Sequence, residues 1–195
     1  RGRTFGENPG LYAVPSDGTA APKLVREGGA EPQFDSTGTR IYFRERRGEK
    51  FVLASVNLTG GEERVHFQSD NAMEIVPSPD GKWVAFSERY RTFIAAFPHS
   101  GRTVDLGPKV SAYPVAQASR DAGTYLHWSG DSRALHWSLG PELYTRDLTK
   151  TFTFVDRAAE KPEPAETAGV PIGFNATSDD PEGVVALEGA RIITM

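Results

Sequence analysis

The sequence predicts an all-β fold built from short antiparallel strands. Helical periodicity is absent over most of the chain, and strand and turn signals alternate at intervals of roughly 8 to 12 residues. A polar tight turn followed by a strand that ends in an aromatic residue occurs three times, at residues 35–43, 78–86 and 129–137. The chain also contains 20 glycines and 14 prolines, which suits a fold with many tight turns.

The spacing of the three copies indicates the architecture. Their aromatic ends, Phe43, Phe86 and Trp137, follow one another at steps of roughly 40 to 50 residues, the length of a β-propeller blade. Each blade is predicted to have four antiparallel strands, of which the second is the strand of the repeat. The innermost strands are expected at 32–34, 74–76 and 126–128. The third strands are expected at 51–56, 93–97 and 142–147, and the fourth at 63–67, 103–106 and 152–155.

The strand after the second turn is predicted to be buried on both faces. Successive side chains of a strand point to opposite faces, so Val84 and Phe86 face one way while Trp83 and Ala85 face the other. Both sets are apolar, as expected where neighbouring blades cover both faces of the sheet. Burial of Trp83 and Phe86 on opposite faces is therefore a test of the blade register.

The polar turn of each repeat is explained by backbone geometry. Glycine adopts positive φ without steric cost, and Asp or Ser side chains bond back to nearby backbone amides. This structural role is assigned to Asp35, Gly38, Asp80, Gly81 and Asp131. Ser132 stands where glycine is usual. The three aspartates would lie far apart around a ring, so they are not interpreted as a metal or acid–base set.

The count of strands gives about three and a half blades. Residues 1–157 are predicted to be a partial β-propeller, with three full blades preceded by two strands of another at 11–15 and 23–26. Propellers usually close with at least about four blades. The first and last blades would otherwise leave apolar faces open. We expect them to be covered by the remaining blades of a longer protein or by a second copy of the chain in a homo-oligomer.

The end of the chain departs from the repeat. Residues 158–183 are rich in charge and proline and are predicted to be an extended linker. Residues 184–195 contain two strand-like segments around Glu188 and Gly189 and are predicted to begin a following domain.

Composition limits the partners of this chain. The net charge is −4 and both signs are scattered, so a basic face for nucleic acid is not expected. The chain has no cysteine, hence no disulfide framework and no thiolate metal site. No apolar run approaches the roughly 20 residues of a membrane span, and no signal-peptide pattern opens the chain. No membrane partner is expected.

No catalytic set, metal site or cofactor is expected within the chain. The four histidines, His66, His99, His127 and His136, lack the His-x-His or His-x-x-x-His spacing of metal ligands. His127 and His136 lie on adjacent predicted strands and are expected to meet across the ladder as sheet-surface or packing residues. No serine lies in a Gly-x-Ser-x-Gly nucleophile elbow.

Binding is expected at charged hairpin tips and at one long loop. The tips at 44–50 and 88–91 are interpreted either as solvated turns or as a polar rim that contacts a partner domain or substrate. Long loops on a rigid scaffold commonly carry function, which adds residues 110–123 to the candidates. The candidate rim or binding residues are Tyr90, Arg91, Tyr113 and Arg120.

The sequence Ser78-Pro79-Asp80-Gly81-Lys82 resembles the turn of the TolB-like propeller repeat, and residues 35–39 and 129–133 match it loosely. The propeller resemblance covers roughly residues 8–155. The stretch 119–137 is similar to the last blades of propellers fused to amidohydrolases. The final residues, 181–195, look like the opening of the small β-sandwich that precedes the metal-dependent barrel of those enzymes.

This resemblance implies an accessory or substrate-access propeller of a metal-dependent amidohydrolase that acts on amide bonds in the periplasm or outside the cell. Zinc or another divalent metal would belong to the catalytic domain, whose His-x-His ligands are not in this chain, so no catalytic residue is carried over. Two alternatives stay open. One is a TolB-like scaffold that binds a protein or peptide, and the other is the gating propeller of a serine peptidase of the prolyl oligopeptidase type.

Overall fold

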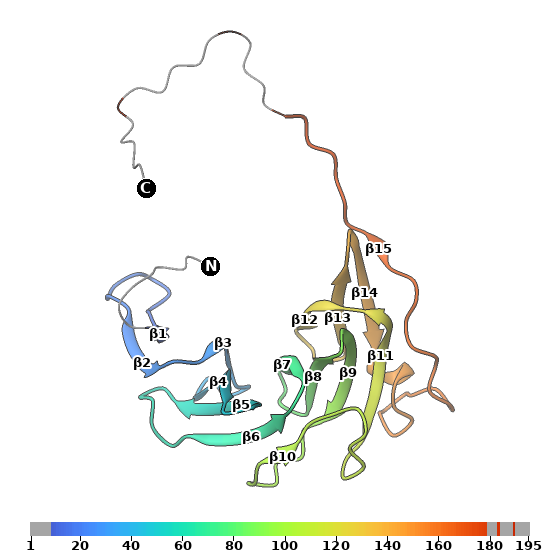
Figure 1. Ribbon diagram of the computed structural model, residues 1–195, viewed down its shortest axis with the longest axis horizontal. Coiled ribbons are helices and arrows are strands. Elements are labelled where there is room, and N and C mark those ends of the chain that lie inside the picture. Colours follow the sequence, from blue (N-terminus) through green and yellow to red (C-terminus); the bar gives the residue numbers. More distant parts are fainter. Residues whose placement is uncertain (1–8, 179–182, 184–188, 190–195) are drawn as a thin grey trace.

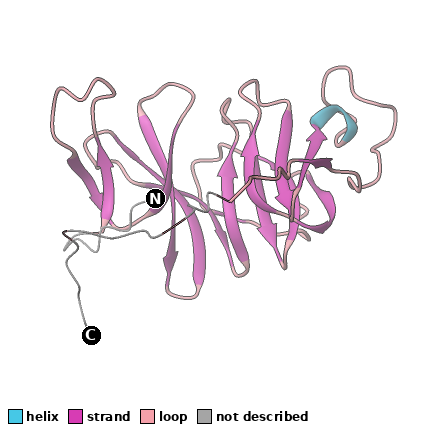
Figure 2. Ribbon diagram, turned by 90° about the horizontal axis from the view of Figure 1, so that it is seen from above, coloured by secondary structure: helices cyan, strands magenta, loops and turns pink. Residues whose placement is uncertain are grey.

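The computed structural model describes residues 9–178 together with Gly183 and Gly189. The predicted all-β fold is confirmed. The sheets stand side by side along an arc (Figure 1). In Figure 2 the strand axes of neighbouring sheets have roughly similar orientations. Within the described residues the only helix is the single 3-10 turn η1 (Leu148–Lys150). A helix long and apolar enough to cross a membrane is not found in that part of the chain.

Each sheet corresponds to a blade or part of one. The N-terminal half-blade pairs β1 (Gly10–Ala13) with β2 (Lys23–Glu27). The first full blade contains β3 (Ala30–Phe34), β4 (Arg40–Arg47), β5 (Lys50–Asn57) and β6 (Arg64–Ser69). The second contains β7 (Ala72–Pro77), β8 (Trp83–Glu88), β9 (Arg91–Ala96) and β11 (Val115–Ala122). The third contains β12 (Thr124–Trp128), β13 (Ala134–Leu139), β14 (Glu142–Asp147) and β15 (Val170–Pro171).

Three apolar clusters fill the spaces between neighbouring sheets. Phe43 lies in the cluster between the half-blade and the first blade, and Phe86 lies in the next, between the first and second blades. Trp83 and Trp137 lie in the third, between the second and third blades. Phe86 is 0% exposed and Trp83 is 9% exposed. The predicted burial of β8 on both faces is therefore confirmed, and this register fixes the second blade between its neighbours.

The Ser-Pro-Asp-Gly turn joins β7 to β8 through side-chain bonds to the backbone. The carboxylate of Asp80 accepts from the hydroxyl of Ser78 at 2.6 Å and from the backbone N–H of Lys82 at 3.0 Å. The Ser78 hydroxyl oxygen in turn accepts from the N–H of Trp83 at 3.0 Å. Gly81 has φ +70°, the left-handed conformation that glycine adopts at no steric cost. These bonds fix the pairing register of β8, beginning at Trp83, with β7.

The other two copies of the turn use the same chemistry. Asp35 accepts from the backbone N–H of Arg40 at 3.0 Å, and Asp131 accepts from the hydroxyl of Ser129 at 2.6 Å. Ser132 adopts φ +61° at the usual glycine position. Its hydroxyl oxygen accepts from the backbone N–H of Asp80 at 2.9 Å. A glycine has no side chain for this bond, so Ser132 links the turns of the second and third blades.

The fourth strand of the second blade is not where the repeat predicts it. Residues 103–106 were expected there, but β10 (Val104–Asp105) pairs in parallel with β6 of the first blade. The backbone N–H of Leu106 donates to the carbonyl of Gln68 at 2.7 Å, and the Gln68 amide donates to Asp105 at 2.8 Å. The eight-residue β11 takes the vacated place beside β9. Most of the predicted loop 110–123 is therefore a strand.

The fourth strand of the third blade is also displaced. Residues 152–155 were expected there, but the chain turns through η1, and Phe152 stacks on Trp83 with ring centroids 4.9 Å apart. Burial of this aromatic ring replaces strand pairing. The outermost strand is instead β15, which pairs with β14 and lies inside the predicted linker 158–183. The predicted strands within 184–195 lie outside the described residues.

A buried arginine holds the segment that leads to β15. Arg146 of β14 is only 2% exposed. Its guanidinium donates to the carbonyls of Pro164 and Glu163 at 2.7 Å each, to the carbonyl of Lys150 at 2.9 Å and to the hydroxyl of Thr151 at 3.0 Å. Burial lowers the pKa of Arg146. These bonds provide partners for a guanidinium that is buried away from water, and they hold residues 163 and 164 against the third blade.

Backbone bonds continue this docking across the second blade. The N–H of Glu166 donates to the carbonyl of Ala118 at 2.9 Å, and the N–H of Arg120 donates to the carbonyl of Glu166 at 3.3 Å. The segment therefore lies beside the outermost strand, β11, before it reaches β15. The segment predicted as a linker is thus bonded to the second and third blades.

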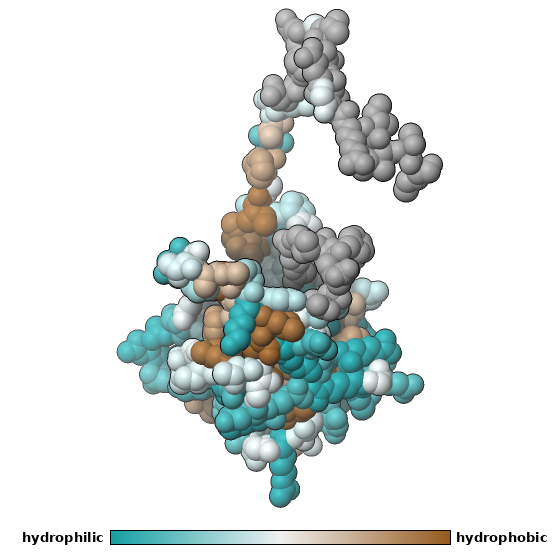
Figure 3. Space-filling view, turned by 90° about the vertical axis from the view of Figure 1, so that its left-hand side faces the viewer, coloured by the Kyte–Doolittle hydropathy of each residue, from teal (hydrophilic) through white to brown (hydrophobic). Residues whose placement is uncertain are grey.

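The two ends of the arc differ in polarity. Figure 3 looks onto the end with the half-blade and shows apolar surface at the centre, ringed by hydrophilic residues. At this end Val14 is 56% and Leu24 is 38% exposed. This agrees with the prediction of an open apolar face.

The outward face of the third blade is mixed in polarity. Its second strand, β13, presents polar side chains there, while the outer strands present Leu143 and Val170, of which Val170 is 65% exposed. Leu135 and Trp137 of β13 pack against the second blade. Alternation along the strand then turns His136 and Ser138 outward. The reason is the sequence of β13, which alternates apolar and polar residues where the first four residues of β8 are all apolar. Covering of the ends by further blades or by a second copy stays a prediction.

Truncation of Phe86 tests the packing of the second blade. Phe86→Ala should lower the free energy of unfolding by about 3–5 kcal/mol, because a fully buried ring is replaced by a cavity. Urea denaturation followed by tryptophan fluorescence measures this. The control is Phe34→Ala, whose ring is 59% exposed and whose loss should change stability by less than about 0.5 kcal/mol. An equal loss of stability in the two variants would mean that the assignment of buried and exposed faces in the blades is wrong.

Substitution of Arg146 tests the docking of the C-terminal segment. Arg146→Met keeps much of the volume but removes the donors that hold the carbonyls of Glu163 and Pro164 against the blade. We expect faster amide hydrogen exchange at Glu166 and easier proteolysis within 158–171. Arg157→Met, at an exposed arginine of the same region, is the control and should leave both unchanged. Unaltered exchange at Glu166 in Arg146→Met would show that this arginine does not hold the segment.

Candidate functional site

A groove of about 1060 Å³ lies between the first and second blades. It is formed at the end of β8 and β9 that is opposite the Ser78–Trp83 turn. The displacement of β10 onto β6 creates it, because residues 106–114 must then cross from the first blade back to β11. The crossing segment forms one wall of the groove, and the β6–β7 connection and the β8–β9 hairpin form the others.

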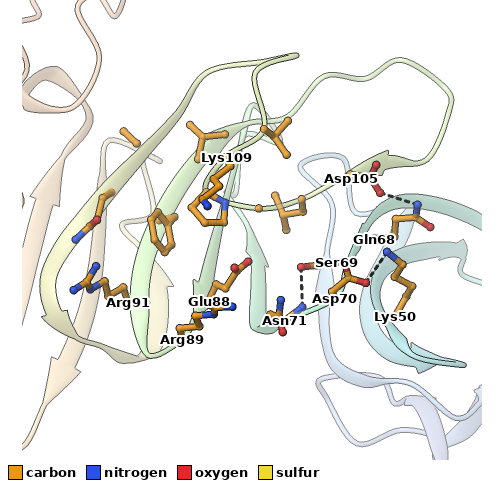
Figure 4. Close-up of a pocket in the computed structure, with 18 residues that line it drawn as sticks. Lys50, Gln68, Ser69, Asp70, Asn71, Glu88, Arg89, Arg91, Asp105 and Lys109 are labelled. Atoms are coloured by element: carbon orange, nitrogen blue, oxygen red, sulfur yellow. Dashed lines mark hydrogen bonds and ion pairs between the residues drawn. The ribbon is translucent and has the colours of Figure 1, made fainter.

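The groove combines an apolar lining with a charged margin (Figure 4). Phe93, Leu106, Val110 and Val115 contribute the apolar lining. At one side Lys50 pairs with Asp70 at 2.6 Å, and this bond raises the pKa of Lys50. The other side carries charged residues from the hairpin and the crossing segment, which are Glu88, Arg89, Arg91 and Lys109.

Positive charge on the hairpin side is not balanced within the described part of the chain. No ion pair involves Arg89, Arg91 or Lys109 among the described residues. Glu88 is the acidic neighbour. Burial raises its pKa, while the charges of Arg89 and Lys109 act in the opposite direction. Three cations beside one partly desolvated carboxyl leave donors available for an anionic ligand.

The hairpin tip at this margin is tight and exposed. Arg89 and Tyr90 both have positive φ, +48° and +71°, which is the pattern of a type I′ two-residue turn. Neither residue is glycine, so the tip stores some backbone strain. Tyr90 is 74% exposed, and its carbonyl accepts from the N–H of Gly123 at 2.8 Å. The tip therefore presents an exposed aromatic ring and an exposed guanidinium from a backbone turn that is bonded to Gly123.

Of the residues assigned to the rim, the structure brings two to this margin. Arg91 lines the groove, and Tyr90 lies at the adjoining tip. Tyr113 does not belong to the rim, which corrects the prediction. It is 8% exposed, its ring packs on Phe67, and its hydroxyl donates to the carbonyl of Asp105. Burial raises the pKa of Tyr113 to about 12. Tyr113 thus helps to hold the crossing segment.

Arg120 lies on the outermost strand, β11, and its guanidinium pairs with Asp121 at 3.0 Å. It is exposed but does not line the groove. The aspartates Asp35, Asp80 and Asp131 stay in their separate turns, as expected for structural residues. They lie at the opposite end of the strands from the groove and do not converge on one another.

The histidines occupy two separate places. His127 and His136 are paired across β12 and β13, with ring centroids 5.0 Å apart, so their predicted meeting across the ladder is confirmed. His66 and His99 lie on either side of Phe97, at the turn end of the blades. Over residues 9–178, Gly183 and Gly189, no three His, Asp or Glu side chains gather as a metal ion would require.

His66 lies in an unusual electrostatic environment. Its Nε2 is 2.8 Å from the hydroxyl of Ser55, and its ring packs between Tyr42 and Phe97. Burial, followed by the positive charges of Arg40, His99 and Arg64, lowers the pKa of His66 from 6.5 to about 4. The imidazole is therefore neutral in the folded protein at neutral pH.

Sequence reasoning missed several groove residues. Asp70, Asp105 and Lys109 stand out by no motif or spacing. They come together only because β10 crosses to the first blade, and that depends on bonds made in the folded chain. The charged tips 44–50 and 88–91 were the available indication, and both contribute to the margin through Lys50, Glu88 and Arg89.

No protein-family profile matches the sequence, and no curated protein sequence matches it. Among solved structures, TolB from Acinetobacter baumannii is 20% identical over 68% of this chain and 33% of that chain, with a TM-score of 0.49. Hydrazine synthase from Kuenenia stuttgartiensis is 14% identical over 65% of this chain and 44% of that one, with a TM-score of 0.41.

A putative 6-phosphogluconolactonase from Bacteroides fragilis is 13% identical over 65% of this chain and 37% of that one, with a TM-score of 0.40. The chain thus spans less than half the length of each of these three structures. At such identities and TM-scores, the propeller assignment rests on the strand order and blade packing of the chain itself.

The depressed pKa of His66 predicts a loss of stability in mild acid. Between about pH 6.5 and 4 the unfolded chain binds a proton at His66 that the folded chain does not. The free energy of unfolding should therefore fall as pH drops through this window. Urea denaturation at several pH values measures it. His66→Gln should flatten the dependence, whereas His127→Gln, at an exposed histidine, should keep it. The same slope in His66→Gln as in the unmodified chain would contradict this assignment.

Proposed function

We propose that this chain is a non-catalytic binding module, the accessory propeller of a larger exported hydrolase of the amidohydrolase type. In this role the groove beside the second blade holds an anionic, extended segment of the substrate or of a partner domain. The observation that supports it most is the set of cations, Arg89, Arg91 and Lys109, which face an apolar-lined groove without carboxylate partners among the described residues.

The size and lining of the groove suit such a ligand. Its volume of about 1060 Å³ is slightly above the range of small-molecule pockets, which span roughly 300–1,000 Å³. The apolar floor would take aliphatic parts of a ligand, while guanidinium groups pair well with carboxylates because of their fixed fork of donors. The exposed ring of Tyr90 at the margin adds a surface for stacking or packing.

The enzyme assignment rests on resemblance. The turn at Ser78 to Lys82 resembles the TolB-like repeat, and residues 181–195 look like the first strands of an amidohydrolase. In that assignment the hydrolytic chemistry, and the zinc or other divalent metal that supports it, belongs to the catalytic domain. The propeller contributes binding and access. A periplasmic or secreted location is part of the same proposal.

Charge reversal in the groove tests the binding role. A fluorescein-labelled oligoglutamate peptide is the probe, and its fluorescence anisotropy with the 195-residue chain is the measurement. The double variant Arg89→Glu, Arg91→Glu should weaken binding by at least roughly tenfold, a change of about 1.4 kcal/mol. Added salt should weaken binding to the unmodified chain as well, because exposed charges are screened.

The control is Arg133→Glu, which changes one exposed arginine at the turn end of the third blade. It should bind the peptide as the unmodified chain does. Equal binding by the groove variant would contradict the proposed site. In the parent enzyme, the groove variant should raise KM for amide substrates and leave kcat unchanged. Unchanged kinetics, together with lost peptide binding, would favour a scaffold that binds a protein partner.

A further inference from the structure

A second, smaller pocket lies at the turn end of the first two blades, away from the groove. It encloses about 140 Å³ between β6 and the connection from β9 to β10. This is well below the roughly 300–1,000 Å³ of pockets for drug-sized ligands. It has room for a small ion or a single substituent of a larger molecule.

The lining of this pocket is basic. Arg64 and His66 come from β6, and His99 and Arg102 come from the connection. None of its lining residues is an aspartate or a glutamate. Neither guanidinium has an ion pair or a hydrogen bond among the residues that the structure describes. Two cations from different segments thus face one small space with no counter-charge in its lining.

The connection holds its residues in place by bonds of its own. The Nε2–H of His99 donates to the carbonyl of Gly81 at 2.6 Å, and the His99 ring stacks on Phe97 at 4.4 Å. The hydroxyl of Thr103 donates to the carbonyl of Val65 at 3.1 Å. These contacts fix both ends of the connection against the first and second blades, so the pocket is a formed feature of the interface between them.

The lowered pKa of His66 is consistent with the same excess of positive charge around the pocket. Its low pKa arises from burial and then from the nearby cations Arg40, His99 and Arg64, while no carboxylate raises it. A bound anion would relieve this repulsion between like charges.

We propose that the pocket binds a tetrahedral oxyanion, such as phosphate or sulfate, or the phosphate group of a small metabolite. Arg64 and Arg102 supply charge-assisted hydrogen bonds from two sides, and a doubly charged anion matches two guanidinium groups. The ring of His66 and the hydroxyl of Ser100 complete the polar lining. The site lies at the other end of the blades from the groove and does not depend on the proposed hydrolase function.

The test is a titration of the 195-residue chain with inorganic phosphate, followed by ¹H–¹⁵N NMR at constant ionic strength set with chloride. Shifts should be confined to residues 64–66 and 97–103, together with the ring resonances of His66 and His99. Sulfate should act in the same way. Glycerol phosphate carries the same group on a carbon skeleton and distinguishes the two ligands. Weaker binding than inorganic phosphate indicates a site for the free ion, and tighter binding indicates a site for a phosphorylated metabolite.

Variants complete the test. Arg64→Gln with Arg102→Gln should weaken phosphate binding by at least roughly tenfold, whereas Arg133→Gln, which removes one charge from the same end of the molecule, should not. Both arginines of the pocket are exposed, so the double variant should keep the unmodified spectrum elsewhere. An identical response to chloride, acetate binding as tight as phosphate binding, or full binding by the double variant would overturn the proposal.

Discussion

The packing of the second blade between two neighbours is the constraint on which the rest of the structure depends. Val84 and Phe86 of β8 are buried against the first blade, while Trp83 and Ala85 are buried against the third. A strand with two apolar faces is stable only when sheets cover both of them. This requirement orders the blades along the arc and gives β8 its central position between two apolar clusters.

Departures from the repeat give the molecule its individual features. β10 pairs with the first blade instead of the second, and the segment that connects it to β11 forms one wall of the groove. Arg146 holds another irregular segment at the third blade, where its buried guanidinium binds carbonyls of the segment leading to β15. Both devices work by satisfying backbone groups outside the regular ladders. The repeated core thus stays constant while irregular segments shape the surface.

The residue pattern was sufficient to predict the buried core of the blades, but not the positions of the outer strands and connecting segments. The alternation around Phe86 and the Asp80–Gly81 turn are local properties, so the blade register could be read from a few residues. The position of β10 depends on bonds from Gln68 and Leu106 across two blades, and no local pattern encodes them. For the same reason Tyr113 was assigned to the binding rim, although its ring is buried in the core. The candidate site was foreseen at the charged tips, which include Lys50, Arg89 and Arg91. Its other members, such as Asp105 and Lys109, come together through long-range pairing.

Native-state hydrogen exchange of the 195-residue chain tests the central claim most directly. If the two-sided packing of the second blade organises the molecule, the amides of β8 and β9 should exchange slowest, at the rate set by global unfolding. Those of β1, β2 and β15 should exchange faster through local opening. Exchange in β8 as fast as in these outer strands would contradict the account, because it would show that the second blade is not held between its neighbours.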